Sequence, residues 1–208
     1  MVSLRSSHAA MTLHGRRIQL RTLGESDFEG WVDVRQRCRD WLLKWEPRSL
    51  HAAHLAEDRR SFVNRCSMRE RERQMGTGFG FGIFHEQRFV GEITLSSIQR
   101  GPLQSAYIGY WIDEAVAGRG LMPEAVVTML QYAFDSLRLH RIEIAIIPRN
   151  AASRRVVEKL GLRSEGVAER YLEIDGVWED HARFAITAEE WHMRAPELVS
   201  NWLLPLHD

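Results

Sequence analysis

Apolar and polar residues alternate with a period of two in several short runs of the chain, which is the pattern of half-buried β-strands. Phe79, Phe81 and Ile83, for example, are separated by single glycines. The run 141–147 is rich in isoleucine and predicts a buried strand. Strands are predicted at about 16–23, 77–83, 89–98, 107–112, 141–147, 163–174 and 177–186.

Between these runs, apolar residues recur at the spacing of an α-helix. Ser26, followed three residues later by Glu29, is a capping-box pattern that predicts the start of the first helix. Helices are predicted over about 26–41 and Leu50–Met75, after Pro123, after Asn150 and, briefly, after Thr187. The predicted order is strand, two helices, three antiparallel strands, helix, strand, helix and hairpin.

Two turns place neighbouring strands in antiparallel hairpins. Asp175-Gly176 predicts the turn of the last hairpin. If the hairpin before it in the chain closes near Ile98 and Gln104, paired residue numbers sum to roughly 202. Glu92 then lies opposite Tyr110, so both side chains share one face of the sheet.

The length of 208 residues and the hydrophobic content of 44% suit one globular domain with a short appendage. Residues 1–14 are polar and are predicted to form a loose lead-in. Residues 15–193 are predicted to form the domain. The tail, 194–208, contains Trp202 and neighbouring leucines and is expected to pack back on the domain.

The 28 basic and 28 acidic residues balance, so the chain has no general attraction to nucleic acid or membranes. No apolar run approaches a membrane span, and the N-terminus lacks the pattern of a signal peptide. Cys38 and Cys66 fall on apolar helix faces and are expected to be reduced core thiols, which is typical of a cytoplasmic protein. His51 and His54 lack an evident third ligand, so no metal site is predicted.

One glycine-rich stretch joins an aromatic strand to a helix and is a candidate phosphate-binding loop. Gly118 and Gly120 allow a pyrophosphate to approach the free amides at the start of the helix. Pro123 suits the first turn, where its missing donor costs nothing. The alternative is a glycine-rich turn that begins an ordinary helix.

With this loop in place, the chain resembles the GNAT superfamily of acyl-CoA N-acyltransferases, whose loop pattern is [Q/R]-x-x-G-x-[G/A]. Residues 115–120 read A-V-A-G-R-G, so Ala115 departs from the polar first position. Residues 107–191 are similar to the Rim branch of the superfamily, in phrases such as I-G-Y-W-I-D, G-R-G-L-M-P-E-A and E-G-V-A-E-R-Y-L. Trp45-Glu46-Pro47 also matches a motif of that branch. The similarity is greatest to enzymes that acetylate the N-terminal alanine of a ribosomal protein.

The resemblance implies a mixed α/β fold with a mostly antiparallel, twisted sheet of about seven strands and helices on both faces. It implies that the parallel strands of Trp111 and Ile144 separate and admit the pantetheine arm of acetyl-CoA. A backbone donor near Trp111 or Ile112 would hold the developing oxyanion. The implied acetyl-CoA contacts are Trp111, Ile112, Ala117, Gly118, Arg119, Gly120, Leu121, Met122 and Asn150.

The resemblance also suggests catalytic residues. Much of the superfamily carries a proton-donating tyrosine where this chain has Val157, whereas the Rim branch uses a serine at the position of Ser153. That serine could equally assist the helix cap. Glu92 is the first candidate for the base, with solvent exposure as the alternative reading, and Glu173 is the second candidate. Expected acceptor contacts are Trp41, Trp45, Tyr110, Tyr171 and Glu173, although Trp41 and Trp45 could simply fill the core.

These features predict an N-acetyltransferase in which a protein N-terminal α-amine attacks the thioester of acetyl-CoA directly. The alternatives are an enzyme acting on a small amine, such as an amino acid, polyamine or drug, and a non-catalytic CoA-binding protein. The expected partners are acetyl-CoA and a protein N-terminus, including that of a ribosomal protein. A monomer or homodimer in the cytoplasm is expected.

Overall fold

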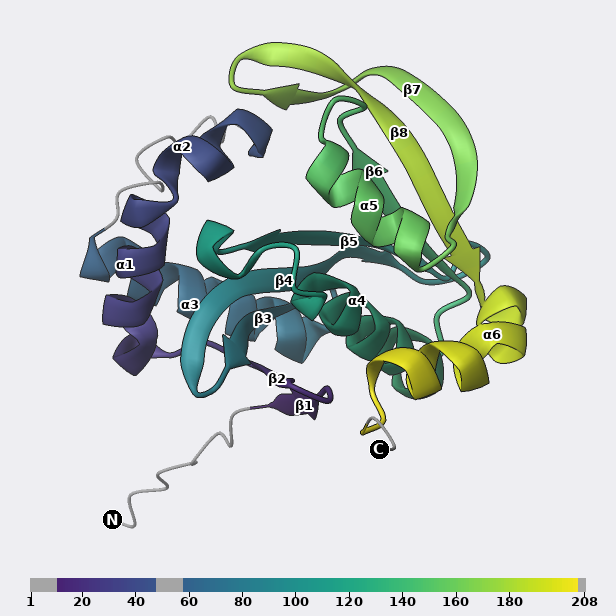
Figure 1. Ribbon diagram of the computed structural model, residues 1–208, viewed down its shortest axis with the longest axis horizontal. Coiled ribbons are helices and arrows are strands. Elements are labelled where there is room, and N and C mark those ends of the chain that lie inside the picture. The colour runs from purple at the N-terminus through teal and green to yellow at the C-terminus, as the bar shows by residue number, and fades with distance from the viewer. Residues whose placement is uncertain (1–10, 48–57, 206–208) are drawn as a thin grey trace.

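The computed structural model describes residues 11–47 and 58–205, and its centre is one eight-stranded sheet in the order β1-β2-β3-β4-β5-β6-β8-β7 (Figure 1). Among the described strands of this sheet, only β5 and β6 are parallel neighbours. The strands are β1 Thr12–His14, β2 Ile18–Arg21, β3 Phe79–His85, β4 Arg88–Gln99, β5 Ser105–Ile112, β6 Arg141–Ile146, β7 Arg163–Ile174 and β8 Val177–Thr187. The mostly antiparallel mixed sheet is confirmed.

The sheet has one strand more than the sequence predicted, because residues 12–14 of the expected lead-in form β1. Thr12 pairs with Arg21 and His14 with Gln19, so this strand forms an edge of the sheet. Three residues are too few to show a period of two, which explains why the pattern missed it.

The helices are α1 Phe28–Arg37, α2 Arg39–Leu42, α3 Arg59–Met75, α4 Leu121–Gln131, α5 Ala151–Lys159 and α6 Ala188–Trp202. Side chains cap the first turns of three helices, with Asp58 at α3, Asn150 at α5 and Thr187 at α6. The capping box expected at Ser26 is wrong. The turn begins two residues earlier, at Gly24. There the Asp27 carboxylate accepts a hydrogen bond from the Gly24 amide (2.9 Å) and forms an ion pair with Arg21 (2.6 Å). The start expected for the second helix, Leu50, lies outside the described residues, and α3 is capped by Asp58.

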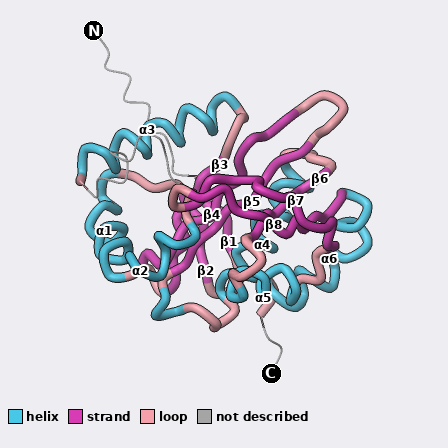
Figure 2. Tube along the Cα trace, turned by 90° about the horizontal axis from the view of Figure 1, so that it is seen from above, coloured by secondary structure: helices cyan, strands magenta, loops and turns pink. Residues whose placement is uncertain are grey.

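Helices cover both faces of the sheet, and each face has its own apolar core. The core beneath α4, α5 and α6 includes Phe81, Leu130 and Ile144. The core beneath α1 and α3 includes Trp31, Phe62 and Phe84. Figure 2 shows α1 and α2 at one end of the molecule and α6 at the other. No helix in the described part of the chain is long and apolar enough to cross a membrane.

α6 continues without a break from Ala188 to Trp202 and so crosses residue 193. Leu198 is buried, and Trp202 and Leu203 pack against the core beneath α4. The C-terminal half of α6 therefore packs on the core.

The pairing of β4 with β5 differs from the predicted register by one residue. Glu92 lies opposite Trp111, and Ile93 lies opposite Tyr110. The register shifts between Ser96 and Gln99, close to the turn from which the sequence count began. A one-residue shift moves every side chain to the other face, so Glu92 and Tyr110 lie on opposite faces of the sheet.

The parallel pair β5 and β6 separates after a short contact. Pairing runs only from Ser105 with Arg141 to Tyr107 with Glu143. Beyond that point β5 stays with β4 as far as Ile112, and β6 stays with β8 as far as Ile146. The two strands therefore enclose a wedge between residues 108–112 and 144–147, as the resemblance implied.

Glu124 joins the start of α4 to the N-terminal strands and is fully buried. Its carboxylate accepts from the backbone amides of Arg17 (2.5 Å) and Ile18 (3.1 Å) and from Arg17 Nε (2.9 Å). This glutamate therefore holds the phosphate-loop helix against β2 and does not face the wedge.

We expect Glu124→Ala to lower the free energy of unfolding by about 2 kcal/mol, because two buried amides lose their acceptor. Urea unfolding monitored by circular dichroism measures the change. Glu124→Gln should lose less, since its amide oxygen still accepts. Glu114→Ala, which removes an exposed glutamate nearby, is the control. Equal stability of Glu124→Ala and the parent would contradict the anchoring role.

Candidate active site

A cleft of about 960 Å³ opens at the wedge between β5 and β6 and extends to both faces of the sheet. It is lined by almost all of the residues expected at the site: Trp41, Trp45, Glu92, Tyr110, Trp111, Ile112, Ala117, Gly118, Gly120, Leu121, Met122, Asn150, Ser153 and Tyr171. Arg119 and Glu173 are not among the lining residues. The Arg119 carbonyl instead accepts a hydrogen bond from Arg17.

The glycine loop enters α4 in a left-handed conformation. Gly118 and Gly120 both have φ of +81°, which disfavours any other residue. Glu124 is the first residue of α4 whose amide bonds back, to the Gly120 carbonyl (3.3 Å), so the amides before it are free to bind an anion. A Cβ on Gly120 would also contact Arg17 and Trp202, so a side chain there is disfavoured by its neighbours as well as by the backbone conformation. Ala115 does not line the cleft.

The wedge exposes backbone donors of alternate residues on β5. The Asp113 amide donates to the Val90 carbonyl on β4 (2.7 Å), which makes the odd-numbered residues of β5 the ones bonded to β4. The N–H groups of Tyr110 and Ile112 therefore point toward β6 and the wedge. The two expected oxyanion donors were Trp111 and Ile112. Because N–H groups alternate in direction along β5, the Ile112 amide is the one that faces the wedge.

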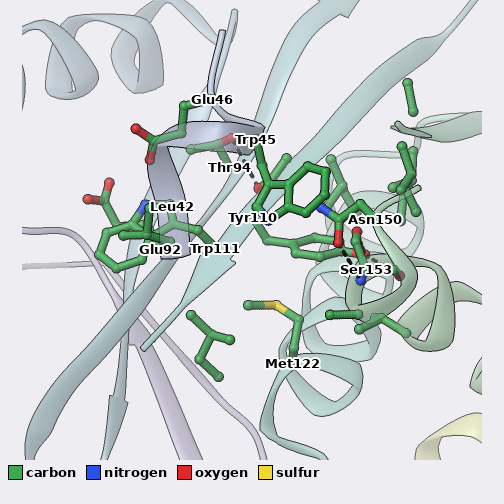
Figure 3. Close-up of a pocket in the computed structure, with 18 of the residues that line it drawn as sticks. Leu42, Trp45, Glu46, Glu92, Thr94, Tyr110, Trp111, Met122, Asn150 and Ser153 are labelled. Atoms are coloured by element: carbon green, nitrogen blue, oxygen red, sulfur yellow. Dashed lines mark hydrogen bonds between the residues drawn. The ribbon is translucent and has the colours of Figure 1, made fainter. Parts of the chain in front are cut away.

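Ser153 contributes its hydroxyl to the cleft and not to the helix cap. The cap of α5 comes from Asn150, whose Oδ1 accepts from the Ser153 amide (3.1 Å). Ser153 Oγ donates to the phenolic oxygen of Tyr110 (2.9 Å), and the phenol donates to the Ser153 carbonyl (3.3 Å). Figure 3 shows Asn150, Ser153 and Tyr110 together on one side of the cleft.

The Tyr110 phenol is a neutral group near pH 7. Desolvation raises its pKa above the ordinary value, and the hydrogen bond with Ser153 lowers it by less. Val157, at the position of the usual proton-donating tyrosine, is a fully buried residue of α5. A phenol therefore does reach this part of the cleft, but from β5 instead of from the helix.

Glu92 lies on the opposite face, beside Trp111, and is buried in an ion pair. Its carboxylate accepts from Trp31 Nε1 (2.7 Å) and from both terminal nitrogens of Arg65 (3.0 Å each). In Figure 3, Glu92 lies across the cleft from Ser153. The expectation that Glu92 is simply exposed to solvent is wrong, because the residue is buried.

The segment after α2 forms a wall of the cleft. Trp45 packs between Lys44 and Arg149, whose charged groups lie 5.3 and 5.7 Å from its ring. Glu46 is held by both terminal nitrogens of Arg35, a buried residue of α1. The segment also reaches the β7–β8 hairpin through a bridge between Pro47 and Ile174, and in Figure 1 the hairpin extends toward α2.

The charges that line this cleft are mainly positive. Among the described residues its carboxylates are Glu46 and Glu92, and each is paired with an arginine. The cations that line it are Arg35, Arg65, Arg69, Arg155 and Lys159. No group of three or more metal-ligating side chains occurs among the described residues.

Several lining residues were not singled out from the sequence. Tyr107 contacts Tyr171, and their hydrogen bond raises the pKa of Tyr107 to about 12. His181, on β8, is buried beside the Tyr171 ring, with centroids 5.6 Å apart. The sequence predicted that His181 lies within a strand. Only the strand order shows that this strand, β8, borders the wedge.

Comparison with known proteins places this fold and cleft in a family. A model described as an acetyltransferase (GNAT) domain matches residues 17–163. A probable N-acetyltransferase of Bacillus subtilis, YjcK, is 38% identical over 84% of this chain and 96% of its own. The [ribosomal protein uS5]-alanine N-acetyltransferase of Escherichia coli is 31% identical over 92% of this chain and 98% of its own.

A solved structure agrees with the sequence comparison. Mycobacterium smegmatis RimJ in complex with CoA-disulfide has a TM-score of 0.83 and 33% identity, over 92% of this chain and 93% of its own. The chain therefore belongs to the GNAT acetyltransferase family. Within that family its relatives include acetyltransferases of the Rim type.

Proposed function

We propose that this protein transfers the acetyl group of acetyl-CoA to the N-terminal α-amine of a protein, with alanine at the N-terminus of a ribosomal protein as the acceptor. The relatives that modify ribosomal proteins motivate the choice of acceptor. The observation that carries it is the charge of the cleft, where both lining carboxylates are already paired with arginine. Such a site repels polycations such as polyamines and suits a neutral amine.

In the proposed reaction, acetyl-CoA lies along α4 and the wedge. The amides at the start of α4 bind the pyrophosphate, and the pantetheine passes between β5 and β6. The neutral amine attacks the thioester carbonyl carbon, whose oxygen accepts from the Ile112 amide. The C–S bond then breaks, and the Ser153 hydroxyl, which rests on the Tyr110 oxygen, turns to the sulfur and protonates the departing thiolate.

Glu92 has a different part in this proposal from the one first expected. The Glu92 carboxylate already accepts hydrogen bonds from Arg65 and Trp31, so its partners are these two side chains and not the acceptor amine. Its ion pair instead fixes α3 and α1 beside Trp111 and shapes the wall that receives the acceptor. Trp41, Trp45 and Tyr171 complete that wall.

Release of free thiol from acetyl-CoA tests the proposal. We expect turnover with peptides bearing an N-terminal alanine, weak turnover with lysine peptides blocked at the N-terminus, and none with polyamines. Turnover with small amines alone would favour a small-molecule enzyme. CoA binding without turnover on any of these amines would favour the non-catalytic alternative.

We expect Ser153→Ala to lower kcat by about 10- to 100-fold, the lower range of general acid catalysis. The effect is moderate because an ordinary thiol has a pKa of about 8.5 and can leave as the thiolate. Binding of CoA should change little, since Asn150 still caps α5. Ser96→Ala, which alters a serine lining another part of the cleft, is the control. An unchanged kcat in Ser153→Ala would assign the hydroxyl to holding Tyr110 alone.

A further inference from the structure

His181 lies on β8 with only 3% of its surface exposed, and yet it lines the cleft. Its Nδ1 lies 3.0 Å from the backbone carbonyl of Glu179. A carbonyl oxygen can only accept a hydrogen bond, so Nδ1 carries the proton. In the neutral ring the other nitrogen, Nε2, then holds a free lone pair. The backbone of β8 therefore sets the tautomer in which Nε2 can accept a proton.

The strand register places His181 on the face of the sheet opposite Ser153. Ala145 of β6 pairs with Arg183, and His181 is two residues from Arg183, so these three share a face. Tyr107 and Glu143, paired across β5 and β6, share it too, as does Trp111. Tyr110 lies on the other face, where it binds Ser153 of α5. A thioester in the wedge would thus have a hydroxyl donor on one face and an imidazole on the other.

The other titratable groups on the same face of the sheet as His181 are already bound to neighbouring side chains. Glu92 is occupied by Arg65 and Trp31. The hydrogen bond with Tyr171 raises the pKa of Tyr107 to about 12, so its phenol stays neutral near pH 7. Glu143 is buried between Arg141 and Arg183. Among the described residues that line the cleft, His181 is the one histidine, and its imidazole offers the Nε2 lone pair as a proton acceptor.

We propose that His181 is the general base of the acetyl transfer, an inference that rests on the proposed function. As the amine nitrogen bonds to the acetyl carbon, it loses one proton to Nε2 of His181. The C–S bond breaks, and the thiolate takes one proton from Ser153. His181 then releases its proton to solvent, and the Ser153 oxygen takes one proton from solvent. One amide and one thiol are formed, and the protons balance.

The charges around His181 include both signs. Glu179, on the same strand, is paired with Arg149 from the loop before α5, and this pair lowers the pKa of Glu179. Arg183 lies two residues further along β8, with its guanidinium 5.8 Å from the Tyr171 ring. Tyr171 comes from β7 and packs on the imidazole. Because these groups also influence the pH dependence of the rate, the variants compared in the test must keep all of them unchanged.

The test is His181→Asn, because the asparagine amide can still donate to the Glu179 carbonyl but has no basic nitrogen. We expect kcat/KM for an N-terminal alanine peptide to fall about 10- to 100-fold at pH 7, with the affinity for CoA unchanged. The parent should show an acidic limb that His181→Asn lacks, over and above the titration of the acceptor amine. His192→Asn, which alters an exposed histidine on α6, should behave as the parent does.

If His181→Asn had the same rate and pH profile as the parent, the assignment of His181 as the base would be overturned, but the proposed acetyltransferase function would stand. Absence of turnover in the parent with every amine would instead refute the proposed function. Nitrogen NMR of the labelled parent gives a result that does not depend on how the variant folds. It should show the neutral His181 ring protonated at Nδ1, and a proton on Nε2 would overturn the inference.

Discussion

Acetyl-CoA is expected to bind Ala117→Glu at least about 100-fold more weakly than it binds the parent protein. Ala117 lines the cleft directly before Gly118, with an extended backbone that accepts any side chain. A carboxylate there would lie near the pyrophosphate. Two like charges about 5 Å apart repel by about 3 kcal/mol at an effective dielectric constant of about 20, which corresponds to more than about 100-fold in affinity.

Titration calorimetry with CoA measures this effect, and two variants separate its causes. Ala115→Glu adds the same charge to an exposed neighbour that does not line the cleft, so its affinity should stay near that of the parent. Ala117→Gln adds similar bulk without charge and should show a much smaller loss. Equal affinities for Ala117→Glu and Ala115→Glu would mean that the pyrophosphate binds elsewhere.

These variants are sounder than substitution of the loop glycines, for a reason that only the backbone reveals. The sequence indicated that glycine keeps side chains away from a phosphate. The structure shows φ of +81° at Gly118 and Gly120, so any substitution there strains the turn whatever it does to the ligand. Loss of binding in such a variant would not distinguish a blocked site from a distorted loop.

Much of the fold could be predicted because its long strands show clear alternation and its turns have strong signals. The Asp175-Gly176 turn and the glycine loop fixed the order of elements, and the family resemblance supplied the separation of β5 from β6. The three-residue strand β1 and the capping of the turn at Gly24 by Asp27 could not be predicted. The first is too short for a period, and the second depends on Arg21 and Asp27 meeting in space.

The candidate site was predicted less completely, because one register error changes which groups face each other. Counting back from the turn placed Glu92 beside Tyr110, but the shift between Ser96 and Gln99 moves the pairing by one residue. Tyr110 therefore meets Ser153 instead, and Glu92 meets Arg65. His181 could not be placed at the cleft from the sequence, because its position there depends on the pairing of β6 with β8, which are far apart in the sequence.

The preference for an α-amine over a lysine side chain is expected to exceed about two orders of magnitude at neutral pH. An α-amino group has a pKa of about 7.7 to 8.0 and a lysine side chain one of about 10.4, so the neutral form of the α-amine is far more abundant. A cleft with an unpaired carboxylate could hold an ammonium and deprotonate it in place. Here Glu46 and Glu92 are both neutralised by Arg35 and Arg65, so the cleft must select the amine that is already neutral.

Mass spectrometry on a peptide with a free N-terminal alanine and one internal lysine measures this preference within a single molecule. A second peptide with an acetylated N-terminus and the same lysine shows whether the lysine reacts when it has no competitor. The preference should shrink as the pH rises toward 10. At that pH the α-amine is already almost fully neutral, whereas the neutral fraction of lysine is still increasing. Because Trp41, Trp45 and Tyr171 line the cleft, replacing the N-terminal alanine by tryptophan should also slow transfer. Acetyl groups found mainly on the lysine at pH 7 would contradict both the neutral-amine mechanism and the choice of a protein N-terminus as the acceptor.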